Sequence, residues 1–147
     1  MRRAFTTLNK GMIAFDLALG ATALAAPRSG LRLLGHRKPS DDAAWLFRRC
    51  GPIWLTFAAA HLAAAGRGRP EDWWALAWLR GTEVATDALW AQGPGFAADP
   101  RARMLLRLAG LGNAAMAAGF GLEARRRSKH LRHARREPEI PLDAEAA

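Results

Sequence analysis

The sequence predicts an all-α fold, specifically a four-helix transmembrane bundle with short loops and a basic C-terminal tail. Half of the 147 residues are hydrophobic, and they gather in four segments bounded by proline or glycine. Each segment is close to the ~20 residues that cross a bilayer core. None alternates with the two-residue period of a strand, so almost no sheet is expected. The predicted spans are 11–26, 43–65, 73–91 and 104–124.

The first predicted span, 11–26, ends before Pro27, which cannot continue a helix with regular hydrogen bonds. Its start, Met1-Arg2-Arg3 followed by an apolar run and small residues at 23–26, would also suit a cleaved signal peptide. Asp16 interrupts the run and more apolar segments follow, so a first membrane span is the preferred interpretation.

Capping signals precede the second and third predicted spans. Ser40, followed by Asp41 and Asp42, predicts a helix N-cap with acidic residues near the positive end of the helix dipole. Glu71 and Asp72 take the same position after Pro70. Between the first two spans, the stretch 31–34 predicts a short turn along the membrane surface.

The fourth predicted span, 104–124, is dense in small residues, which let helices approach closely in lipid. It completes a membrane domain over 1–124. Residues 125–147 form a cytoplasmic tail that is basic and then acidic, with disorder expected from about residue 137. We expect the tail to contact anionic lipid headgroups, because its basic run directly follows a span. Nucleic acid is an unlikely partner, because no aromatic residue interrupts the run.

The distribution of basic residues predicts the orientation. Of 22 Lys and Arg, twelve would lie on the side that holds both termini and six on the other side. The positive-inside rule therefore predicts a multi-pass protein of the bacterial inner (plasma) membrane with both termini in the cytoplasm. Trp73 and Trp74 open the third span and Trp90 closes it, as interfacial tryptophans do.

Ionisable residues inside the predicted spans are the main argument against lipid. Each costs about 2.5–3.5 kcal/mol near a span centre. A soluble helical interaction domain would explain them more simply and stays an alternative. In lipid they must face one another or a wet cavity. Arg80, Glu83 and Asp87 are spaced i, i+3, i+7 and form one stripe on a helix.

Two interpretations of these charges compete. They could pair internally and hold helices together, in a scaffold or accessory subunit that assembles as a homo- or hetero-oligomer. Alternatively, they could serve a small membrane-embedded enzyme, an isomerase or cyclase acting on a lipid or terpenoid-like substrate. In that case Glu83 and Asp87 are the acid/base candidates, and Arg80 and Arg49 orient the substrate. Asp16 is the fifth catalytic candidate.

No metal or cofactor is predicted. The single cysteine, Cys50, and four scattered histidines lack the spacing of a zinc site. Cys50 is expected to be a small buried thiol. His61, near the end of the second span, is expected to be a packed or interfacial histidine rather than a ligand.

Three short motifs resemble those of small four-helix bacterial membrane proteins in the neighbourhood of the DoxX-like group. They are Ala26-Pro27 at the end of the first span, Leu46-Phe47-Arg48-Arg49-Cys50-Gly51 in the second, and Leu79-Arg80-Gly81 in the third. The resemblance covers about residues 9 to 124. It implies topology rather than chemistry, because such families mostly lack an assigned activity. The acids of 82–87 match no motif of the group.

Overall fold

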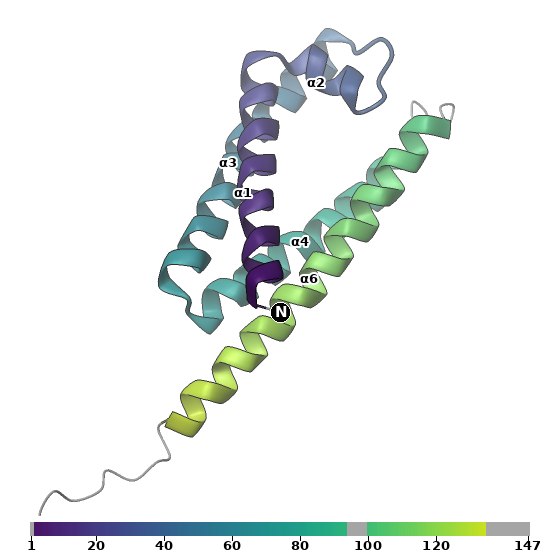
Figure 1. The fold of residues 1–147 in the computed structure, drawn as a ribbon. Coiled ribbons are helices and arrows are strands. Elements are labelled where there is room, and N and C mark those ends of the chain that lie inside the picture. Colours follow the sequence, from purple (N-terminus) through teal and green to yellow (C-terminus); the bar gives the residue numbers. More distant parts are fainter. Residues whose placement is uncertain (1, 94–99, 135–147) are drawn as a thin grey trace, which may run out of the picture.

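The structure is a computed structural model that describes residues 2–93 and 100–134, and all regular secondary structure in those ranges is helical. This confirms the all-α prediction. The helices are α1 (Arg2–Ala25), α2 (Pro27–Leu33), α3 (Asp41–Arg67), α4 (Pro70–Trp90) and α6 (Pro100–Ala134) (Figure 1). Among the described residues, one helix is long and apolar enough to cross a membrane, over Pro100–His133.

The predicted capping residues begin the helices as expected. Ser40 is the N-cap of α3, and its hydroxyl oxygen accepts a hydrogen bond of 3.2 Å from the backbone N–H of Ala43. Pro70 opens α4, with two acidic residues in the first turn. Pro27 opens the short helix α2, which covers part of the predicted surface turn. Local sequence therefore determines where these helices start.

All four long helices are longer than the predicted spans, α1 and α6 by the most. Helix α1 begins at Arg2 rather than at residue 11, and α6 continues ten residues beyond 124. The first part of the predicted tail is therefore helical. Arginine, lysine and alanine favour helix, and Arg127 donates a 2.7 Å hydrogen bond to Glu123 one turn earlier. The acidic part of the tail, with the predicted disorder, lies outside the described residues.

The long helices associate as two pairs, α1 with α3 and α4 with α6, as Figure 1 shows. Glycines allow the first pair to approach closely. A Cβ atom added to Gly20 of α1 would lie 3.0 Å from the carbonyl oxygen of Gly51 on α3 and 2.9 Å from Leu55 Cδ2. The backbones of α1 and α3 are therefore in close contact where these two helices cross.

Specific contacts hold the helix ends together at both ends of the molecule. At one end, which we call the basic end, Arg127 of α6 donates a 2.7 Å hydrogen bond to the carbonyl oxygen of Gly68, in the turn between α3 and α4. The N-terminal part of α1 lies there too, because the ring centroids of Phe5 and Trp73 are 5.1 Å apart.

At the opposite end, Gly35 follows α2 with a φ of 102°. A Cβ atom at Gly35 would lie 2.5 Å from that of Ala102 on α6, so both the backbone conformation and the contact require glycine.

Replacement of Gly20 by alanine should destabilise the protein by about 1–3 kcal/mol, the usual cost of an overpacked contact. Gly11→Ala is the matched control on the same helix, since a Cβ atom there meets nothing within 4 Å. The control should be neutral or stabilising by up to about 1 kcal/mol. Thermal unfolding of the purified variants measures both effects, and equal midpoints for the two variants would contradict the close crossing.

Candidate functional site

A buried polar network joins α1, α3 and α4 at the centre of the fold. Arg80 of α4 pairs with Asp16 of α1 through its Nη2 atom, which also lies 2.9 Å from Nε2 of His61 on α3. His61 Nδ1 lies 2.7 Å from Oδ1 of Asn9 on α1. We call these four residues the Arg80 network. It connects α1, α3 and α4.

The geometry determines the tautomer of His61. A guanidinium group only donates hydrogen bonds, so Nε2 of His61 must accept from Arg80. The ring proton therefore sits on Nδ1 and is donated to Asn9 Oδ1. The amide nitrogen of Asn9 in turn donates a 3.3 Å hydrogen bond to the backbone carbonyl of His61. With His61 neutral, the network holds one positive and one negative charge, which balance.

Burial of the network is nearly complete. Asp16 and His61 are 0% exposed and Arg80 is 1% exposed. Arg80 lies ten residues from each end of α4, or roughly 15 Å along the axis. Its guanidinium carbon is 5.4 Å from the ring centroid of Phe57, and Phe120 contacts His61 edge-on with centroids 5.3 Å apart. The charges are thus enclosed by aromatic rings, where a missing partner is costly.

The other residues of the predicted α4 stripe lie outside this network. Glu83 and Asp87 are half-buried. Glu83 interacts with the side chain of Trp54 on α3, and Asp87 accepts a 3.1 Å hydrogen bond from Asn113 of α6. Successive turns of α4 therefore contact different helices. Arg80 contacts α1 and α3, Glu83 contacts α3, and Asp87 contacts α6, so the three side chains do not form one site.

Arg49 lies apart from the other catalytic candidates, because its side chain is exposed on the surface of α3. The two further arginines predicted within spans lie toward the opposite end of the molecule. Arg48 stacks on Trp45, with its guanidinium carbon 4.9 Å from the ring centroid, and Arg107 is exposed near the start of α6. Of the five catalytic candidates, only Asp16 and Arg80 are in direct contact.

The prediction that His61 is a packed histidine is confirmed, since it is 0% exposed. The structure adds that it bridges Asn9 and Arg80, which the sequence does not predict. A signal for its burial was present in the sequence. Ala58 and Ala64, three residues to either side, are both buried, so His61 lies on a face of small residues that packs inward.

Within the described residues, no group of three or more His, Cys, Asp or Glu side chains could hold a metal ion. The chain matches no family model, no curated protein and no solved structure. The resemblance to the DoxX-like group therefore stays a prediction.

The Arg80 network can hold helices together more readily than it can act on a substrate. Each member contacts another member, although Asp16 Oδ1 and Arg80 Nε have no hydrogen-bond partner, and the pair of charges is neutral overall. The groove lined by Phe5 and Gly68 and the smaller one lined by Ala25 and Trp45 contain no member of the network. The arrangement is that of an interhelical connector.

A double-mutant cycle tests the connection. Asp16→Asn and Arg80→Met should each lower the free energy of unfolding by about 3–5 kcal/mol, because each leaves the other charge buried and unpaired. The double variant should lose clearly less than the sum, because no uncompensated charge remains. Arg49→Met, at an exposed arginine, is the control and should change stability by about 0.5 kcal/mol or less. Strict additivity would contradict the pairing.

Proposed function

We propose that the protein is an integral membrane scaffold or accessory subunit in which α1, α3, α4 and α6 cross the bilayer together. The observation that carries this proposal is that large ionisable side chains are buried while large apolar side chains are exposed. Three of the five largest fully buried side chains are ionisable, namely Arg80, His61 and Asp16. Large apolar side chains lie on the outside of every long helix.

The exposed apolar side chains are too many and too large for a protein in water. Trp78 is 74% exposed, and Leu89 and Leu111 are each 69% exposed. A soluble bundle gains stability by removing such groups from water, at about 25 cal/mol per Å². In a bilayer the same side chains meet hydrocarbon, and the inward ionisable residues avoid it.

Assembly of the helices explains how the less apolar ones could enter lipid. Helix α6 alone has the composition of a spanning helix. Helix α4 carries Arg80, Glu83 and Asp87, each with an insertion cost of about 2.5–3.5 kcal/mol when unpaired. Asp16 balances the charge of Arg80, and Asn113 of α6 donates a hydrogen bond to one carboxylate oxygen of Asp87. We infer that α4 is stable in the membrane only when packed against its neighbours.

The larger number of Lys and Arg residues at the basic end, twelve against six, supports an orientation with both termini in the cytoplasm. The basic end collects Arg67, Arg69 and the Arg/Lys-rich last turns of α6, and the positive-inside rule assigns such an end to the cytoplasm. Helix α6 is about 52 Å long, which exceeds the ~30 Å hydrocarbon core, so its basic part would extend beyond it.

A scaffold or accessory role follows from what the buried charges do. Asp16, Arg80, His61 and Asn9 contact one another across three helices, so their main role is to hold these helices in register. The exposed apolar surface of the bundle is then free to contact lipid or the spans of another subunit. The small-residue side of α6 remains the proposed partner-facing surface.

The topology predicts opposite labelling of two introduced cysteines. In a Cys50→Ser background, Lys38→Cys at the opposite end should react with a membrane-impermeant maleimide added to intact cells. Lys129→Cys, the matched position at the basic end, should react only after permeabilisation. Both lysines are exposed, so accessibility within the fold does not differ. The protein should also stay in the membrane pellet after carbonate extraction.

Reversal of the labelling pattern would contradict the orientation, whereas recovery of a compact monomer in the carbonate supernatant would contradict the membrane proposal itself. The scaffold role further expects crosslinked membranes to yield species larger than the 16.0 kDa chain. Monomers alone would contradict that role.

A further inference from the structure

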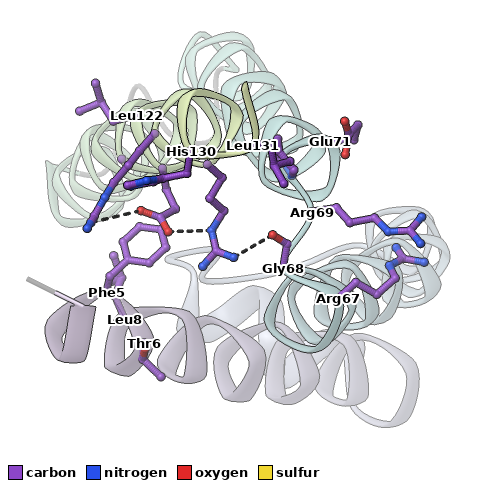
Figure 2. Close-up of a pocket in the computed structure, with 15 residues that line it drawn as sticks. Phe5, Thr6, Leu8, Arg67, Gly68, Arg69, Glu71, Leu122, His130 and Leu131 are labelled. Atoms are coloured by element: carbon purple, nitrogen blue, oxygen red, sulfur yellow. Dashed lines mark hydrogen bonds and ion pairs between the residues drawn. The ribbon is translucent and has the colours of Figure 1, made fainter. Parts of the chain in front are cut away.

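A large open groove lies at the basic end, between the N-terminal part of α1, the turn that joins α3 to α4, and α6. Its volume is about 1200 Å³. Figure 2 shows Phe5 and Leu8 on the α1 side, Gly68 and Arg69 across from them, and Leu122 on α6. The volume exceeds the roughly 300–1,000 Å³ of typical small-molecule sites, so the groove suits an extended ligand.

The wall of the groove is apolar along α1 and α6. Leu8 is 44% exposed, Leu122 is 66% exposed and Leu131 is 53% exposed, although all three line the same hollow. Phe5 and Gly119 complete this wall, and the missing side chain of Gly119 keeps the groove deep. An occupant with a hydrocarbon portion would cover these groups.

The charged groups of the groove leave a positive excess. Four arginines and two glutamates line it. Arg67 is engaged by Asp72 at 2.7 Å. Arg127 is engaged by Glu123 and by the carbonyl of Gly68, each at 2.7 Å.

Glu123 is shared, because its Oε1 accepts from Arg127 while its Oε2 forms a longer ion pair of 4.0 Å with Nη1 of Arg126. Arg69 is exposed at the start of α4, and Glu71 follows it in the same groove. Four arginines against two glutamates leave a positive excess, and Arg126 keeps N–H donors for an external anion, since arginine binds phosphate through two parallel N–H donors.

We propose that this groove binds one anionic phospholipid. Its hydrocarbon chain lies along Phe5, Leu8 and Leu122, and its phosphate contacts Arg126, with Arg69 adding positive charge at the rim. The combination of an apolar wall with a rim of net positive charge matches the two parts of such a lipid, and neither a free phosphate nor a neutral lipid would use both. The assignment to a membrane lipid rests on the proposed function, which places this end of the bundle at the bilayer surface.

Native mass spectrometry of the full chain in a mild nonionic detergent tests the site with phosphatidylglycerol as the probe. The wild-type protein should retain one phosphatidylglycerol, and the Arg69→Ala/Arg126→Ala variant should bind it roughly tenfold more weakly or worse. The matched control is Lys129→Ala/Arg132→Ala, which removes the same charge from the exposed last turns of α6, outside the groove. This control should bind like the wild type.

Competition measurements distinguish a bound phospholipid from a bound soluble anion. Phosphatidylcholine should compete poorly, and glycerol phosphate, the headgroup without chains, should not displace the lipid. Gly119→Phe fills the apolar wall and should weaken binding without removing charge.

If the Lys129/Arg132 control lost as much phosphatidylglycerol binding as the groove variant, the proposed site would be overturned. Binding would then come from general attraction of the anionic lipid to the basic helix. If glycerol phosphate displaced the lipid, the proposed phospholipid ligand would be contradicted and a soluble anion would be favoured. Circular dichroism confirms that each variant is folded. Carbonate extraction of the same strains reports the membrane proposal separately, so the two can fail independently.

Discussion

The pairing of Arg80 with Asp16, completed by His61 and Asn9, is the interaction on which the rest of the structure depends. Helices α1 and α3 already meet closely at Gly20 and Gly51, and α4 meets α6 along its length. The network ties α4 to the first pair from within, because a single guanidinium nitrogen contacts partners on α1 and α3. Hydrocarbon packing has no directional preference, whereas these contacts permit one register only.

The inverted polarity of the fold follows from the same constraint. Asp16 and Arg80 pair inside the bundle, and many leucine and tryptophan side chains are exposed on the outside. In water this arrangement would forgo much of the hydrophobic stabilisation that drives folding. In lipid it places each group where its transfer free energy is lowest. In the proposed orientation the basic end would lie at the headgroups, where the groove at this end combines an apolar wall with arginine side chains.

Much of the fold could be predicted from local signals. Pro27, Ser40 and Pro70 mark helix starts, and apolar periodicity fixes the number of long helices. The candidate site was only partly predictable, because contacts between helices depend on rotation and crossing that no local pattern encodes. Asp16 and Arg80 meet across 64 positions of sequence. Arg49 has the same chemistry as Arg80, but the rotation of α3 directs it outward, and that same rotation brings His61 inside.

The central claim is that lipid contacts the apolar exterior while the Arg80 network is shielded from it. Labelling with a lipid-soluble carbene precursor in reconstituted bilayers, followed by peptide mass spectrometry, measures this directly. The account predicts strong modification at Trp78, Leu89 and Leu111, with none at Asn9, Asp16 or His61. Labelling of the network residues, or protection of those three apolar side chains, would contradict it.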